Sequence, residues 1–122
     1  MSDQDRHLPQ AAPVESYGDG GFRFAGMSHR GSILCLPGGI WAWPVADVSD
    51  LTEETLARVF ASPIALFVLG AGKTSWTMPE DLRWHFRAKQ IAVEIAQTRH
   101  AIMTYNILLD EGRRVGAGLI AV

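Results

Sequence analysis

The spacing of apolar positions is most regular in the second half of the chain. Residues 64–69 are all apolar and lead into Gly70-Ala-Gly72. A short run without a polar position is typical of a central strand that is covered on both faces of a sheet. A helix is predicted over residues 77–89 and a strand over residues 91–95. Together these elements predict a βαβ unit with two parallel strands.

A second helix is predicted from its expected N-cap Thr98 to residue 111, with Gly112 at the C′ position. Its main apolar stripe consists of Ala101, Ile102, Tyr105, Leu108 and Leu109. Met103 and Ile107 are apolar on another side of the same helix. A helix that is apolar on two sides is either covered twice within its own domain or covered by a partner. We therefore interpret Met103 and Ile107 as a candidate interface.

The N-terminal part of the chain has the pattern of short strands separated by turns. Residues 1–13 are polar without a period and are predicted to be a disordered tail, followed by a single domain of residues 14–122. Residues 14–24 predict a hairpin around a glycine-rich turn, and residues 28–31 predict a second turn.

Further elements are predicted between these two regions and at the C-terminal end. Residues 33–36 indicate a buried strand, and residues 40–43 indicate an extended segment with Trp41 and Trp43 on one face. The spacing of Asp50-Leu-Thr-Glu53 matches a capping box and predicts the start of a helix there. A final strand is predicted over residues 115–122.

Composition and charge exclude several classes of protein. The net charge of −2 provides no general attraction to nucleic acid. The longest apolar runs have the length of a strand, so no transmembrane segment is expected. The first residues lack the cationic start and apolar stretch of a signal peptide, and we expect a cytoplasmic protein.

No catalytic or metal-binding pattern stands out among the chemically reactive residues. Cys35 is the only cysteine, which excludes an intramolecular disulfide and a cysteine zinc site. It lies in an apolar strand and is interpreted as an inert core residue. The four histidines lack metal-ligand spacing. We therefore expect no metal site, no cofactor and no catalytic residue.

The glycines after the first long apolar run resemble phosphate-binding motifs only in part. A P-loop requires glycine where Phe67 stands, and a dinucleotide fingerprint requires glycine where Ser75 stands. The favoured interpretation is that Gly70 and Gly72 turn the chain sharply away from the strand.

A second hypothesis is an anion site at the same edge of the sheet, formed by Gly70, Gly72, Lys73, Arg99 and His100. Parallel strands end at one edge, which is where open α/β sheets bind ligands. Arg99 and His100 oppose the positive end of the helix dipole, and an anion or an acidic partner group would offset this. The alternative is ordinary solvated surface charge.

Several motifs occur together in a fixed order along the chain. They are Gly70-Ala-Gly72, Pro79, the triplet Thr104-Tyr105-Asn106, and Glu111-Gly-Arg113-Arg114 followed by Val-Gly-Ala-Gly-Leu. As a set they resemble the Mth-like domain family of unknown function, which includes a mitochondrial complex I assembly factor. The resemblance implies a three-layer α/β sandwich with a central mixed sheet and an N-terminal β-rich portion. It implies no established catalytic residue.

Two functions are compatible with these observations. The leading hypothesis is a non-enzymatic protein with an interaction or assembly role, which has a protein partner or forms a homo-oligomer. The absence of a catalytic pattern and the second apolar side of the helix favour it. The alternative is a small-molecule or anion-binding protein, or an enzyme, that uses Gly70–Lys73 and Arg99–His100.

Overall fold

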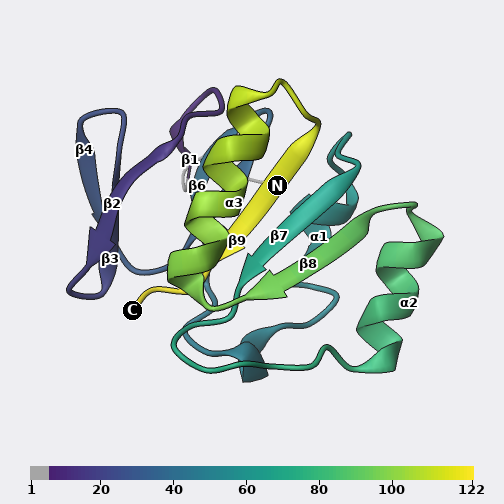
Figure 1. Cartoon of the computed structure of the whole chain (residues 1–122). Helices are drawn as coiled ribbons and strands as arrows, with labels where there is room; N and C mark the ends of the chain where they lie inside the picture. Colours follow the sequence, from purple (N-terminus) through teal and green to yellow (C-terminus); the bar gives the residue numbers. More distant parts are fainter. Residues whose placement is uncertain (1–5) are drawn as a thin grey trace.

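The computed structural model describes residues 6–122 and shows an α/β fold with two sheets (Figure 1). The strands are β1 (Arg6–Leu8), β2 (Val14–Gly18), β3 (Gly21–Phe24), β4 (Met27–Arg30), β5 (Ile33–Leu36), β6 (Gly39–Ala42), β7 (Leu66–Gly70), β8 (Ala92–Ala96) and β9 (Val115–Leu119). The helices are the 3-10 helix η1 (Val48–Asp50), α1 (Ala57–Phe60), α2 (Glu80–Ala88) and α3 (Thr98–Asp110).

The larger sheet is mixed and has the strand order β1-β6-β5-β9-β7-β8. β7 pairs in parallel with both β8 and β9, whereas β9 pairs antiparallel with β5. The predicted apolar strand is therefore an interior strand of the sheet. Its prediction as part of a parallel βαβ unit is confirmed.

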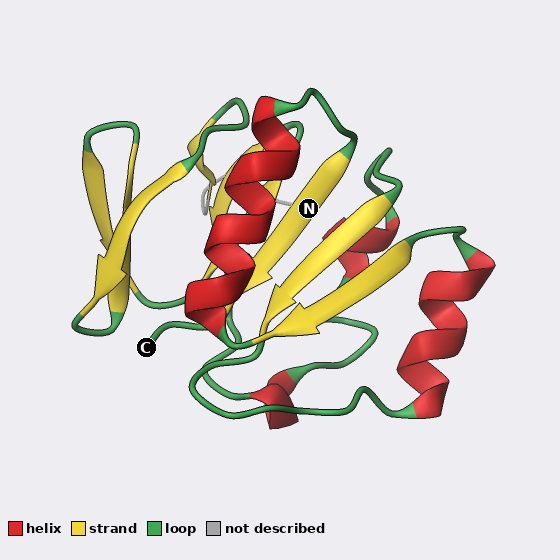
Figure 2. Cartoon of the chain, in the orientation of Figure 1, coloured by secondary structure: helices red, strands yellow, loops and turns green. Residues whose placement is uncertain are grey.

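Helices cover both faces of this sheet (Figure 2). Val68 of β7 packs in a core cluster with Ala101 and Tyr105 of α3, while its neighbour Phe67 packs with Phe86 of α2 in a separate cluster. Successive residues of a strand point to opposite faces, so one apolar strand supplies both cores. The expected three-layer α/β architecture is confirmed.

The smaller sheet has the order β2-β3-β4 and stands beside α3 (Figure 1). The predicted hairpin around residues 18–21 is confirmed, but the second turn predicted at residues 28–31 is wrong. The chain turns earlier, where Ala25 and Gly26 have φ values of 49° and 75°. Two successive positive φ values are typical of a tight hairpin turn, so residues 27–30 continue as a strand.

The predicted helix start at Asp50 is also wrong. Asp50 closes a capping box with Asp47 around η1, and its carboxylate accepts hydrogen bonds from the backbone N–H groups of Ala46 and Asp47. The observed capping box therefore spans residues 47–50, one turn before the predicted box of residues 50–53. The longer helix starts later, and Val59 of α1 is buried as its apolar pattern requires.

The structure also differs from the expectation at the N-terminal end. Part of the predicted tail, Arg6–Leu8, forms β1 and pairs antiparallel with β6. These residues are mostly exposed, so their sequence carries no apolar alternation that would indicate a strand. Residues 1–5 lie outside the described range. Within residues 6–122, no helix has the length and apolar character needed to cross a membrane.

Candidate functional site

Tyr105 and Asn106, the last two residues of the Thr104-Tyr105-Asn106 triplet, attach the start of β2 and the segment before it to α3. The amide of Asn106 accepts a hydrogen bond from Val14 N–H at 2.9 Å and donates one to the Val14 carbonyl at 2.8 Å. The Tyr105 hydroxyl donates to the Ala12 carbonyl at 3.3 Å, and the side chain is fully buried. A buried hydroxyl needs a partner, so this motif has a structural role that positions β2 next to the helix.

A groove of about 480 Å³ lies between β2 and α3. We call it the β2–α3 groove, and it is lined by Val14, Glu15, Ser16, Tyr17, Arg99, His100, Ile102, Met103 and Asn106. It therefore brings together residues from both sites predicted from the sequence, namely Arg99 and His100 of the anion site and Met103 of the interface.

Large apolar side chains are exposed around this groove. Met103 is 62% exposed and Tyr17 is 45% exposed, and both line it. Ile107 is 58% exposed and follows Met103 by one helical turn, which places both side chains on one face of α3. Three of the five large apolar side chains that are exposed within residues 6–122 thus belong to this surface.

The charged residues of the groove are not neutralised by their surroundings. Within the described part of the chain, no side-chain hydrogen bond or ion pair involves Arg99 or His100, and the first turn of α3 contains no acidic residue. Glu15 lines the opposite, β2 side of the groove, where its carboxylate keeps its negative charge and accepts a hydrogen bond from Gly26 N–H at 2.9 Å. The α3 side of the groove presents Arg99 without a paired acidic side chain, next to a positive helix end.

The glycine loop at the predicted anion site is joined to α3 by Thr98. The Gly72 N–H donates to the Thr98 hydroxyl at 3.0 Å, and that hydroxyl donates to the Ile120 carbonyl at 2.7 Å. Thr98 is fully buried, and it is the first residue of α3 rather than its N-cap. The loop and the helix start are adjacent, but the Gly72 amide is already hydrogen-bonded. Lys73 is exposed and does not line the β2–α3 groove.

The two glycines of this loop are required for different reasons. Gly72 has a φ of 92°, as expected for a sharp turn. Gly70 is not among the positive-φ residues, and the sharp-turn explanation is wrong for it. A Cβ atom at Gly70 would lie 2.9 Å from the Cα of Thr98, so close packing against α3 requires the glycine.

The Glu111-Gly-Arg-Arg motif ends α3. Gly112 N–H donates to the Leu109 carbonyl and Arg113 N–H donates to the Leu108 carbonyl, which is the Schellman arrangement. The positive φ of Gly112, 76°, makes this turn possible. The Arg114 carbonyl then accepts from the start of β7, which aligns β9 beside that strand. The backbone of this motif thus ends α3 and positions the start of β9.

Cys35 and Tyr105 contact each other in the core beneath α3. Burial raises the pKa of the Cys35 thiol from 9.0 to about 12. Burial also raises the pKa of the Tyr105 hydroxyl, and the neighbouring Cys35 adds to this effect. Both groups stay protonated at neutral pH, so neither supplies a nucleophile or a base there.

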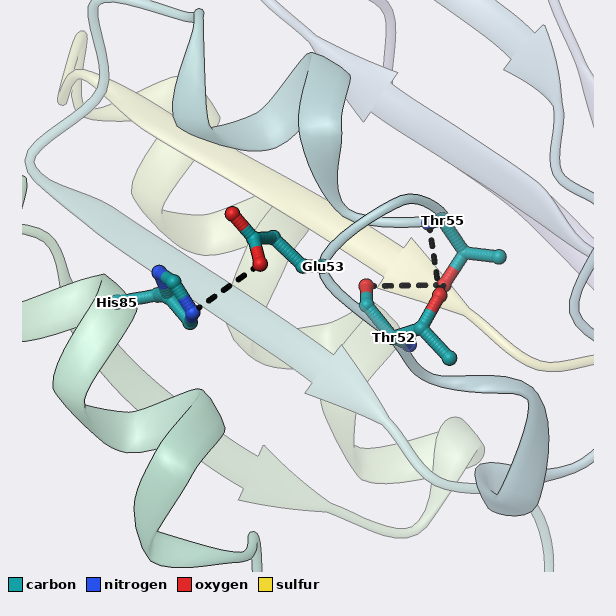
Figure 3. Close-up of polar contacts among 4 residues, drawn as sticks. All are labelled: Thr52, Glu53, Thr55 and His85. Atoms are coloured by element: carbon teal, nitrogen blue, oxygen red, sulfur yellow. Dashed lines mark hydrogen bonds and ion pairs between the residues drawn. The ribbon is translucent and has the colours of Figure 1, made fainter.

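A second surface lies on the opposite side of the large sheet, between α1 and α2. His85 Nε2 of α2 is 3.4 Å from a carboxylate oxygen of Glu53, and the Thr52 and Thr55 hydroxyls contact each other nearby (Figure 3). Trp84 is 60% exposed beside this pair. A single exposed aromatic residue is ordinary on a protein surface, and Trp84 therefore serves as a reference position for the α3 surface.

Comparison with known proteins places the chain in a family. A family model described as a protein of unknown function, DUF498/DUF598, matches residues 14–120. An uncharacterized protein of Rhodobacter capsulatus is 34% identical over 120 residues, which cover 98% of this chain and 93% of that protein. Mouse NADH dehydrogenase (ubiquinone) 1 alpha subcomplex assembly factor 3 is 33% identical over 93% of this chain, which spans only 62% of that protein.

Solved structures have the same fold. A crystal structure of an outer membrane protein from Bartonella henselae matches with a TM-score of 0.90 and 42% identity, covering 95% of this chain and 99% of that one. A Bordetella pertussis protein described as a Mth938-like domain matches with a TM-score of 0.79 and 25% identity, covering 89% and 85%. The chain belongs to the DUF498/DUF598 family of unknown function, and the resemblance to Mth-like domains is confirmed.

The wall of the groove formed by β2 could not be found in the sequence. Glu15 and Tyr17 have no motif around them, and their position depends on the contact between Asn106 and Val14 across 92 residues of chain. The Asn106 side chain was the one available signal, because asparagine is unfavourable inside a helix unless its amide is used.

Proposed function

We propose that this chain is a non-enzymatic interaction protein and that its binding surface consists of the β2–α3 groove together with Ile107. The observation that carries this proposal is the exposure of Met103, Ile107 and Tyr17 around one groove. Exposed apolar residues that gather on one surface are typical of a contact site with another protein, whereas scattered ones are not.

The composition of the surface supports a protein as the ligand. Tyrosine, methionine and arginine are enriched where proteins bind one another, and all three border this groove. Met103 and Ile107 belong to a helix that is anchored by buried Ala101 and Tyr105, so the surface is presented by a rigid element. A preorganised surface loses less conformational entropy on binding.

Assembly of a larger complex is the specific role that we propose. One relative of the chain is named an assembly factor of NADH dehydrogenase (ubiquinone). An assembly factor binds its client through a surface and needs no catalytic residue. The match covers 93% of this chain, and α3 lies within it.

Charge substitution on α3 tests the proposed surface. Ile107→Glu places a charge at an exposed position and leaves the core unchanged, so we expect the melting temperature to stay the same. Proteins that co-purify with a tagged form of the wild-type chain should be lost in this variant. Trp84→Glu is the matched control, because Trp84 has a similar exposure on the other side of the sheet. Unchanged association of Ile107→Glu, or equal loss in Trp84→Glu, would contradict the proposal.

The rival function is binding of a small anion at Gly70–Lys73 and Arg99–His100. The uncompensated charge of Arg99 at the start of α3 favours it. Phosphate titration followed by amide NMR shifts distinguishes the two functions. Saturable shifts at Gly72, Lys73 and Arg99 that weaken with salt and with Lys73→Ala would support anion binding, and flat titrations would exclude it.

A further inference from the structure

Asn106 occupies only one position on the outer edge of β2. On its inner side β2 is paired with β3. On its outer side the Asn106 amide accepts from Val14 N–H and donates to the Val14 carbonyl. These are the two hydrogen bonds that a neighbouring strand makes with one residue of an antiparallel ladder. The side chain of α3 thus imitates a partner strand at the first residue of β2.

The rest of this edge is open. Gly18 and Gly21 are the pair that closes the two-residue turn, so their backbone groups face each other. Because backbone groups alternate along a strand, the N–H and C=O of Tyr17 point to the outer edge. Within residues 6–122, no hydrogen bond satisfies these two groups from that side. Residues 15–18 are exposed, and residues 15–17 line the groove.

An open strand edge is a template for another extended segment, and such strand addition is a recurring mode of peptide recognition. Here the opposite wall of the groove carries the positive charges of Arg99 and of the α3 N-terminus. Met103 and Tyr17 supply apolar contacts along the same wall and edge. A segment that fits this groove is extended, has apolar side chains at alternating positions and carries an acidic side chain.

We infer that the β2–α3 groove binds an extended acidic segment of a partner protein, which adds as a strand to the outer edge of β2 and places a carboxylate against Arg99 and His100. This inference rests on the proposed function and specifies the partner's chemistry. A second copy of β2 fits less well, because its only acidic residue, Glu15, is held by the Gly26 N–H.

The test begins with display selection of random twelve-residue peptides on the full chain. Enriched peptides are expected to alternate apolar residues, to contain an acidic residue and to lack a central proline. One synthetic peptide is then methylated at single backbone nitrogens. Methylation at every second nitrogen should weaken binding about tenfold, the order expected from one lost hydrogen bond and its steric clash, while the intervening positions change little.

Variants of the chain test the same contacts from the other side. Arg99→Ser should weaken binding about tenfold, the order of a charge-assisted hydrogen bond, and Arg99→Lys should restore part of it. Tyr17→Pro removes the outward N–H and should abolish binding, whereas Tyr17→Phe should keep it. The melting temperature and the amide NMR spectrum show whether Tyr17→Pro retains its fold, and the peptide methylation series tests the edge without altering the chain.

Each outcome has a distinct meaning. Peptides that are insensitive to backbone methylation but are lost in Met103→Glu would overturn strand addition while the proposed function stands. The inference would be overturned if no peptide is enriched. It would also be overturned if the enriched peptides bind the Arg99 and Tyr17 variants as tightly as they bind the wild type. Dimerisation of the chain alone that is lost in Tyr17→Pro would assign the edge to a second copy and would also overturn it.

Discussion

Thr98→Val is the substitution that tests most sharply how the glycine loop, α3 and the C-terminal segment are joined. Valine has nearly the same shape as threonine but has no hydroxyl. The substitution therefore removes the 2.7 Å bond to the Ile120 carbonyl and the 3.0 Å bond from Gly72 N–H together. The site is fully buried, so water does not replace the lost hydroxyl.

The expected loss follows from these two bonds. A buried donor or acceptor that is left unsatisfied costs about 1–3 kcal/mol. The Gly72 N–H and the Ile120 carbonyl both lose their partner when this one hydroxyl is removed. Gly72 is only half-buried, so its contribution is at the lower end of this range. We therefore expect Thr98→Val to lower the free energy of unfolding by about 2–4 kcal/mol, a large part of the stability of a domain of this size.

Urea denaturation measures this loss, with the slope of the transition confirming that the folded state is comparable. Thr98→Ser is the matched variant, because it keeps the hydroxyl and loses only a methyl group, at about 1 kcal/mol. Thr104→Val on the same helix should change stability by less than about 0.5 kcal/mol. A Thr98→Val protein as stable as the Thr104→Val protein would refute the reasoning.

Three further predictions concern the core and β2. Burial raises the pKa of Cys35 to about 12, so the folded state holds this proton more tightly than the unfolded state. The stability that this proton contributes is complete below pH 9.0 and is lost as the pH rises toward 12. Over that range, the urea midpoint should therefore fall more in the wild type than in Cys35→Ala. Gly118→Ala should destabilise the chain by about 1–3 kcal/mol in the same assay, because its Cβ would lie 2.5 Å from a ring carbon of Trp43; no loss would show that the ring moves without cost. Asn106→Leu leaves the N–H and C=O of Val14 without their partner and should accelerate hydrogen exchange at Val14, while unchanged exchange would show that this clamp is unimportant.

Local patterns predicted the elements whose neighbours are close in sequence. The apolar run before Gly70 and the period of α3 predicted the correct types of element. A strand covered on both faces is continuously apolar over a short length, and a helix covered along one stripe has a period of about 3.6 residues. The capping box at Asp50 was placed one turn too late, because four-residue cap spacing is compatible with several starting points. The position of β9 between β5 and β7 could not be predicted, since no local pattern encodes which strand is its neighbour.

The sequence singles out the α3 residues of the candidate site, but neither its β2 residues nor the arrangement of the two walls. The second apolar side of α3 singled out Met103 and Ile107, and the structure shows that both are exposed. Arg99 and His100 were grouped with the glycine loop, whereas the structure places them in the groove beside Tyr17. This arrangement depends on a hydrogen-bonded contact between distant segments, and the sequence contains only the asparagine that makes it.

Photo-crosslinking inside the source cell tests the central claim most directly. A photoreactive amino acid at Ile107 should form a defined adduct with another protein, and the same residue at Trp84 should form none, although both positions are similarly exposed. The adduct at Ile107 should disappear when Met103→Glu is added in the same chain. Adducts at Trp84 with none at Ile107 would contradict the account, because the binding surface would then lie on the α2 side of the sheet.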